Sequence, residues 1–225
     1  MKITWLGQAG LLIETEDIKI ISDPYLSNSC FKLNPASDRR MPVDESYLKI
    51  KPDVLILTHD HLDHTDPETL ENYLGKNEGI LVLASQNAWN HAREMSKGHN
   101  YVMFNRHTQW TFGNVSFTAV KAEHSDEHAI GVIIEAEGKK IYITGDTLYN
   151  TEIFADLPKD LDVVFLPVNG VGNNLNMTDA ARFAEKTGAS KVVPVHFGLF
   201  DNLNPAEDFK CENKIIPSIY EEIKL

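Results

Sequence analysis

The sequence contains few cysteines and no long apolar run. Its two cysteines, Cys30 and Cys211, lie far apart and lack Cys-x-x-Cys spacing, which favours reduced thiols and leaves one disulfide as the alternative. No apolar stretch approaches the roughly 20 residues that cross a bilayer. The N-terminal residues also lack the basic start and continuous apolar core of a signal peptide. These absences predict a cytoplasmic protein with no membrane partner.

Basic residues are outnumbered in this chain. There are 21 lysines and arginines against 33 aspartates and glutamates, which gives a formal net charge of −12. Proteins that bind DNA or RNA usually carry a basic face, whereas the basic clusters here are no longer than Arg39-Arg40 and Lys139-Lys140. The composition argues against a nucleic acid and favours a small-molecule substrate, which bound divalent cations could help to hold. Association into a homo-oligomer stays open.

Length and composition indicate one globular domain, residues 1–225. Apolar residues make up 42% of the chain and charged residues 24%, which is typical of a folded protein with a sizeable core. Three short strand candidates open the chain, and a polar stretch, residues 23–45, follows them. The length of this stretch indicates a functional loop, and we expect its first residues, Asp23-Pro24-Tyr25, to lie near a site.

The rest of the chain alternates between strands and helices. Continuous apolar runs are typical of strands buried on both faces, and Asp66-Pro67-Glu68 has the cap, proline and acidic first turn of a helix start. This order is typical of a layered α/β (α+β) fold whose second half repeats the first in outline. The predicted strands are residues 2–6, 10–15, 18–21, 53–57, 80–84, 108–112, 115–120, 130–135, 139–144, 163–166 and 191–195, and the predicted helices are 66–74, 85–95 and 178–187.

The stretch THDHLDH, residues 58–64, carries three histidines and two aspartates directly after an apolar strand. Alternate residues of an extended chain face the same side, so His59 and His61 can point at one cation. Asp63 and His64 lie past the turn and can reach a second cation about 3.5 to 4 Å away. Imidazoles and carboxylates are ligands that divalent metals accept, and crowding them without a metal would need costly pKa shifts. The stretch predicts a metal site.

Other predicted strands end in residues of the same kind, and strand ends are where α/β sheets gather ligands and catalytic groups. These residues are His124 in AEHS, Asp146 in TGDT and His196 in PVHFG. His128 follows His124 by four residues, and its position favours a substrate contact and simple exposure about equally. The remaining histidines have no ligand partners in sequence and indicate surface or local structural roles; they are His91, His99 and His107.

In order and spacing, this set resembles the metallo-β-lactamase superfamily with its His-x-His-x-Asp-His motif. The resemblance covers essentially the whole chain and implies a four-layer αββα sandwich, with two β-sheets face to face and helices outside. It also implies a metal-dependent hydrolase that uses metal-activated hydroxide, with Asp63, Asp146 and His61 as catalytic residues. By the same resemblance, His59, His61 and His124 hold one metal ion, Asp63, His64 and His196 hold a second, and Asp146 bridges the two.

Finer resemblances bear on the substrate. Secreted antibiotic-degrading members carry a cysteine ligand and an export signal, and Asp146 instead places this chain with intracellular hydrolases. Asn176-Met177-Thr178 and the late Pro-x-His are similar to the branch that contains L-ascorbate-6-phosphate lactonase, often manganese-dependent, which implies a lactone or ester substrate. The likeness puts Asn169 and Asn176 at the substrate edge, and the position of His128 four residues after His124 makes it a candidate for a further substrate contact. The arginine-rich segment of that branch is replaced here by NGVGNNLNM, residues 169–177, which contains no basic residue.

Two other functions stay open at this point. A phosphodiesterase or nuclease of the same superfamily would use the same ligands, although the acidity of the chain counts against it. A non-catalytic metal-binding sensor would keep the fold and lose turnover. Zinc, manganese and iron all suit a site made of histidine and aspartate, so the sequence predicts two divalent ions without choosing the element.

Overall fold

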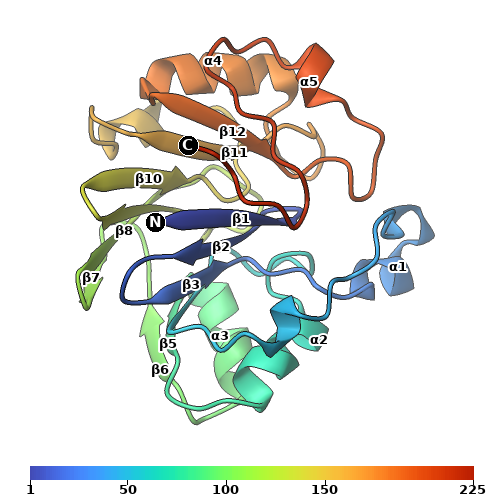
Figure 1. The fold of residues 1–225 in the computed structure, drawn as a ribbon, viewed down its shortest axis with the longest axis vertical. Coiled ribbons are helices and arrows are strands. Elements are labelled where there is room, and N and C mark those ends of the chain that lie inside the picture. The colour runs from blue at the N-terminus through green and yellow to red at the C-terminus, as the bar shows by residue number, and fades with distance from the viewer.

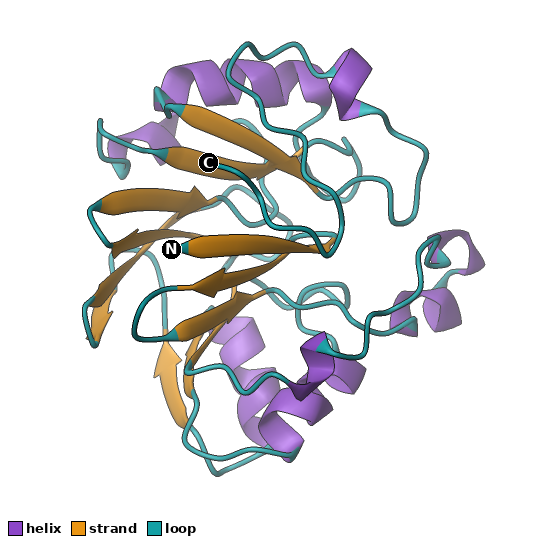
Figure 2. Cartoon of the chain, in the orientation of Figure 1, coloured by secondary structure: helices purple, strands orange, loops and turns teal.

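Two β-sheets packed face to face form the centre of the molecule, and helices cover the outer face of each (Figures 1 and 2). The structure is a computed structural model that describes residues 1–225. The arrangement is the predicted αββα sandwich. The first sheet contains β1 (Lys2–Gly7), β2 (Gly10–Glu14), β3 (Lys19–Ser22), β4 (Val54–Leu57), β5 (Leu81–Ala84) and β6 (Asn100–Met103). The second contains β7 (Gln109–Phe112), β8 (Val115–Lys121), β9 (Ile130–Ala136), β10 (Lys139–Ile143), β11 (Val163–Pro167) and β12 (Lys191–Val195).

Both sheets begin as antiparallel meanders and end as parallel strands. In the first sheet, β1, β2 and β3 pair antiparallel, and β3 to β6 pair parallel. In the second, β7 to β10 pair antiparallel, and β10 to β12 pair parallel. Strands β8, β10 and β12 therefore end at the same edge of their sheet. This shared edge brings together loops that are far apart in sequence.

The helices connect the parallel strands and pack outside the sheets. At the start of α2, Asp66 accepts backbone N–H groups of Glu68 and Thr69, and a proline follows it, as the sequence predicts. Helix α4 ends at Gly188, whose left-handed φ of 68° suits glycine. None of the helices combines the length and hydrophobicity that crossing a bilayer requires. The α-helices are α1 (Ser29–Leu33), α2 (Pro67–Leu70), α3 (Gln86–Met95), α4 (Met177–Thr187) and α5 (Pro205–Asp208).

The core has two parts, separated by the first sheet. A cluster of 41 buried residues fills the space between the sheets and extends to α4, and a cluster of 14 lies between the first sheet and α2 and α3. Strand β4 contributes to both, because Val54 and Ile56 belong to the larger cluster while Leu55 and Leu57 belong to the smaller one. This alternation follows from the two-residue period of a strand. It explains why the strand is apolar at every position.

Three local predictions were wrong. Strand β6 was not predicted because its four residues, an edge strand of the sheet, are only half-buried or exposed and lack a continuous apolar run. The helix predicted over 66–74 divides into α2 and a π-helical turn, Glu71–Gly75. The stretch 23–45, expected to be a loop, contains α1 and a short 3-10 helix, Pro35–Ser37. The side chain of Arg39 orders this stretch by donating to the carbonyl of Tyr25 and the hydroxyl of Tyr220.

Asp156 is a carboxylate with a nearly buried side chain that joins the segment after β6, the end of β8 and the turn after residues 151–155. It accepts hydrogen bonds from Arg106 at 2.7 and 2.9 Å and from the backbone N–H of Lys121 at 3.0 Å. Burial would raise its pKa, but Arg106 and the Lys121 N–H outweigh burial and lower the pKa to about 2. Because the folded-state pKa lies below the ordinary value, this carboxylate stabilises the fold near neutral pH and loses that effect as pH falls through about 2.

We expect Asp156→Asn to lower the free energy of unfolding by about 1 to 2 kcal/mol at pH 7, since Arg106 is partly exposed. The difference from the unsubstituted protein should shrink as pH falls below about 4, which is near the ordinary pKa of aspartate. Urea unfolding of the metal-free proteins between pH 7 and pH 3 measures both quantities. Asp160→Asn is the control, because Asp160 is exposed and pairs only with Lys140. A loss that does not change with pH would contradict this account.

Candidate metal centre

Seven histidine and aspartate side chains lie together where the two sheets meet at the shared edge. The segments that carry them follow β4, β8, β10 and β12, and each strand holds its loop in place through buried backbone pairing. The sequence predicts that all seven hold two metal ions, and the structure brings all seven together. They are His59, His61, Asp63 and His64 after β4, His124 after β8, Asp146 after β10 and His196 after β12.

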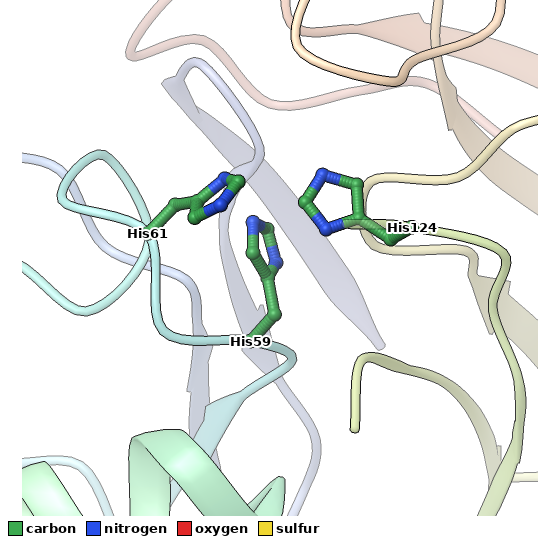
Figure 3. Close-up of side chains that lie close together, drawn as sticks. All are labelled: His59, His61 and His124. Atoms are coloured by element: carbon green, nitrogen blue, oxygen red, sulfur yellow. The ribbon is translucent and has the colours of Figure 1, made fainter. Parts of the chain in front are cut away.

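The first group consists of three imidazoles that converge on one point (Figure 3). The ring centroid of His59 lies 4.7 Å from that of His61 and 4.5 Å from that of His124. The ring centroids of His61 and His124 lie 4.7 Å apart. His59 is fully buried, and its Nε2 has no hydrogen-bond partner. Burial, together with neighbouring His64, holds the pKa of His59 well below its usual range. A neutral imidazole offers a lone pair, so this group can hold a cation.

The second group consists of Asp63, His64 and His196. Their ligand atoms lie within 4.8 Å of one another, and Oδ2 of Asp63 lies 3.1 Å from Nε2 of His196. Although these atoms are close, Nε2 of His64 and Nε2 of His196 are buried without a hydrogen bond. Buried polar atoms nearly always have a partner. Ligand atoms that lie this close together without aligned hydrogen bonds are the arrangement expected around a bound cation.

Asp146 lies between the two groups. Its Oδ1 is 3.3 Å from Nε2 of His64, and its Oδ2 is 3.3 Å from Nε2 of His196. Both of these histidines belong to the second group. Asp146 also forms a possible metal-holding set with His59 and His64, so the carboxylate reaches the first group through His59. Gly145 allows this close approach: its φ is +60°, and a Cβ there would lie 2.8 Å from the carbonyl oxygen of Ile130 and 3.0 Å from the side chain of Thr58, which follows β4 of the other sheet. Only glycine fits this position without a shift of the backbone.

Charges within the cluster compensate one another. Burial would raise the pKa of both carboxylates, but His64 and His196 lower the pKa of Asp63 below its usual range and that of Asp146 well below it. Burial would lower the pKa of His196, but Asp146 and Asp63 raise it to about 10. The same carboxylates, with Asp23, raise the pKa of His64 well above its usual range despite burial. The cluster is therefore held together by buried ion pairs between its carboxylates and its imidazoles. A bound cation would replace these pairs.

Asp23 holds His64 in place from behind. This aspartate is fully buried, accepts the backbone N–H of Thr58 at 2.8 Å and its hydroxyl at 2.6 Å, and lies 3.1 Å from Nδ1 of His64. A carboxylate at Nδ1 fixes the ring so that Nε2 faces the site. The sequence analysis placed Asp23 near the site without giving it this role. Its partner lies 41 residues away, so no local pattern could show the contact.

The loop between β11 and α4, residues 169–176, contacts three of the seven side chains. It has the glycines and asparagines needed for a tightly folded path, and Gly170, Gly172 and Asn173 all have positive φ. The loop therefore closes over the second sheet's side of the cluster. Its contacts are Nδ2 of Asn169 with Nδ1 of His196 at 3.0 Å, the carbonyl of Gly172 with Nε2 of His124 at 3.0 Å, and Nδ2 of Asn174 donating to Oδ2 of Asp146 at 2.8 Å.

The three residues predicted to contact substrate have different positions. Asn169 touches His196 instead of lying free at the rim. Asn176 caps α4, and its side-chain Oδ1 accepts the N–H groups of Thr178 and Asp179. His128 belongs to none of the groups that could hold a metal, and its Nε2 lies 3.6 Å from Oε1 of Glu127. A substrate contact stays a prediction for all three. The side-chain oxygen of Asn176 is already occupied by the helix cap.

Gln8 and Asn174 are supporting residues whose roles the sequence analysis missed. Nε2 of Gln8 donates to Oδ2 of Asp63 at 3.0 Å and lies 3.3 Å from Nδ1 of His196. Asn174 lies in the loop of residues 169–176, and no sequence pattern marks it as a supporting residue. The other histidines have the local roles predicted for them, such as the contact of His91 with Asp60 at 2.9 Å. His107 similarly contacts Asp156 at 3.1 Å.

We expect Asn174→Ala to weaken metal binding about 10- to 100-fold, because the variant leaves Oδ2 of Asp146 without its donor. The side chain of Asn174 is buried and contacts the cluster only through this bond, so the fold should persist. Competition with a chromophoric chelator measures the affinity for zinc. Asn114→Ala, in the exposed turn between β7 and β8, is the matched control. Equal affinities of the two variants would show that Asn174 does not position the carboxylate.

The fold and the cluster together define a metal-dependent hydrolase of the metallo-β-lactamase class. The family model described as the beta-lactamase superfamily domain matches residues 19–197, and the chain belongs to that family. Within it, the chain belongs with the UPF0173 metal-dependent hydrolases. It is 30% identical to one from Exiguobacterium, over 94% of this chain and 92% of that protein. It is 32% identical to one from Geobacillus thermodenitrificans, over 89% of this chain and 87% of that protein.

Solved structures share the fold at lower sequence identity. Igni18, a metallo hydrolase from the archaeon Ignicoccus hospitalis, is 21% identical, with a TM-score of 0.77 over 98% of this chain and 96% of that one. An isothiocyanate hydrolase from Delia radicum gut bacteria is 20% identical, with a TM-score of 0.74 over 100% and 99% of the two chains. These likenesses establish the architecture. The resemblance to the ascorbate-6-phosphate lactonase branch stays a prediction.

Proposed function

We propose that this protein uses two divalent cations, held by the seven-residue cluster, to hydrolyse a small lactone or ester. The observation that carries the proposal is the set of buried atoms without partners: Nε2 of His59, His64 and His196, and Oδ1 of Asp146. Leaving such atoms unsatisfied costs about 1 to 3 kcal/mol each. Zinc, manganese and iron all accept these ligands, so the residues fit a pair of ions.

When bound, two such ions supply an activated water at neutral pH and an electrophile for the substrate carbonyl. The chain's own residues would position the two ions and neutralise part of their charge. His59, His61 and His124 define one position, Asp63, His64 and His196 define the other, and Asp146 reaches both. Asp63 is partly exposed, at 19% of its side chain, and Gln8 fixes its Oδ2. The Asp63 carboxylate is therefore partly open to solvent, and it can accept a proton during hydrolysis.

The surroundings favour a lactone or ester over a nucleic acid. A chain with a net charge of −12 lacks the basic face that would bind a phosphodiester polymer. The loop over the cluster, residues 169–176, has no lysine or arginine to grip a phosphate. All seven candidate ligands are present, so the chain shows no loss of site residues of the kind expected where turnover has been lost. Both cysteines are free thiols, which supports a cytoplasmic setting for the reaction.

The test combines metal content with substrate choice. The purified protein is stripped with a chelator, reloaded with zinc or with manganese, and examined by elemental analysis and by hydrolysis assays. The assays use a simple γ-lactone, an aryl ester and a bis-aryl phosphodiester. About two ions per chain together with turnover of the lactone or ester supports the proposal. Turnover of the phosphodiester alone would replace it with a phosphodiesterase, and failure to bind any metal would overturn the proposal.

A further inference from the structure

We propose that a polar cavity beside His61 binds an uncharged, polyhydroxylated part of the substrate. This inference rests on the hydrolase function proposed above and names the chemistry of its substrate. The cavity has a volume of about 520 Å³ and no hydrophobic residue in its lining. Helix α3 forms one wall through Asn90 and Glu94, and the segment after His124 forms the other through Ser125.

The cavity adjoins the candidate metal centre directly. His61 belongs to the first imidazole group and also lines the cavity. Ser125 and Asp126, on the opposite wall, follow His124 of the same group in sequence. Figure 3 shows that His61 and His124 face each other across this group. A substrate whose carbonyl lies at the cluster can therefore extend past His61 into the cavity.

Two of the three carboxylates that line the cavity, Asp60 and Asp126, already have partners within the protein. Asp126 accepts the backbone N–H of Asp60 at 3.0 Å, Nδ2 of Asn87 at 2.7 Å and the backbone N–H of His128 at 3.0 Å. Asp60 in turn lies 2.9 Å from Nδ1 of His91. These contacts tie the metal-binding loop, helix α3 and the segment after His124 into one frame. The frame exists before a ligand arrives, so binding loses little conformational entropy.

Other polar groups in the cavity are free. The side chains of Asn90, Glu94 and Ser125 are exposed and make no hydrogen bond within the protein. Together they offer both donors and acceptors, which is the pattern that hydroxyl groups satisfy. An apolar group would find no apolar side chain to contact. An ammonium group can only donate hydrogen bonds, so it could not use the donors of Asn90 and Ser125, and the uncharged polyol, which both donates and accepts, is the better match.

An anionic group is disfavoured in the same place. Three carboxylates line the cavity, those of Asp60, Glu94 and Asp126, and no lysine or arginine lines it. Like charges at close range repel strongly near a protein surface. A phosphate placed here would approach these carboxylates without a cation to offset them. The cavity thus selects against a phosphorylated lactone or ester whose phosphate extends past His61.

The test reverses the charge of Glu94 and compares two acetate esters, glycerol monoacetate and its 3-phosphate. We expect the metal-loaded protein to prefer the uncharged ester by at least about tenfold in kcat/KM. Glu94→Lys should reduce this preference about tenfold without changing metal content, since Glu94 contacts no residue of the cluster. The matched control is Glu185→Lys on α4, at the opposite end of the molecule (Figure 1). Equal preferences in the two variants would overturn the proposal.

A binding measurement separates this inference from the proposed function. Sorbitol is titrated into ¹⁵N-labelled, metal-loaded protein, and the side-chain amide signals of Asn87 and Asn90 are followed. Shifts that Glu94→Lys weakens and Glu185→Lys preserves support the cavity even if neither ester is cleaved. Cleavage of both esters without any shift of these signals overturns the cavity and leaves the hydrolase standing.

Discussion

Asp146→Asn is expected to lower hydrolysis by about 10³-fold or more while the fold persists. The carboxylate reaches both groups, because it lies in one possible metal-holding set with His59 of the first group and His64 of the second. Its two oxygens also lie 3.3 Å from the two histidines of the second group. An amide keeps the shape of the side chain but removes the negative charge that a cation needs. Metal catalysis contributes several kcal/mol to transition-state stabilisation, and each 1.36 kcal/mol corresponds to a tenfold change in rate. The estimated loss follows from about 4 kcal/mol.

Turnover and metal content must be measured on the same samples. His61→Ala should give a similar loss through the first imidazole group, because its ring completes the set of three. Asp160→Asn, the same change at an exposed residue that pairs with Lys140, should keep full activity. Circular dichroism confirms that each variant is folded. Undiminished turnover in a metal-bound Asp146→Asn protein would show that the cluster is not the catalytic centre.

Most of the fold could be predicted because its signals are local. Strand β12 was predicted with its observed bounds, and β4 and β5 within one residue, because each is a short apolar run buried on both faces. Strand β6 lacked that signal, since pairing with β5 rather than burial makes it a strand. The π-helical turn after α2 likewise depends on packing against its neighbours. Local propensity carries no information about either.

The candidate site likewise has a part that local sequence predicts and a part that only the tertiary structure shows. The THDHLDH stretch is local, so its spacing alone indicates which side chains turn toward one point. The supporting contacts join segments far apart in sequence: Asp23 reaches His64 across 41 residues, and Gln8 reaches His196 across 188. Aspartate and glutamine are common surface residues, and only the tertiary structure shows that these two are buried. Sequence reasoning therefore found the ligands and missed the residues that hold them.

Loading the protein with metal is expected to raise its melting temperature by roughly 10 °C. Metal-free protein buries several nitrogen atoms without partners, including Nε2 of His59 and Nε2 of His64, and it also buries a carboxylate, Asp146, beside them. A ligand that binds only the folded state adds about 4 kcal/mol of stability at a concentration 1,000 times its Kd. For a chain of this size, about 1 kcal/mol corresponds to a shift of roughly 2 to 4 °C.

The measurement is thermal unfolding of chelator-treated protein, before and after stepwise addition of zinc or manganese. Asp146→Asn should show a much smaller shift, because a cation at either position loses the shared carboxylate. His107→Gln is the matched control, since His107 contacts Asp156 and lies outside the cluster; it should keep the full shift. Coincident melting curves with and without metal would mean that the buried atoms are satisfied in another way. Stabilisation without turnover would instead favour the metal-binding sensor, because the ions would then support the fold without supporting the reaction.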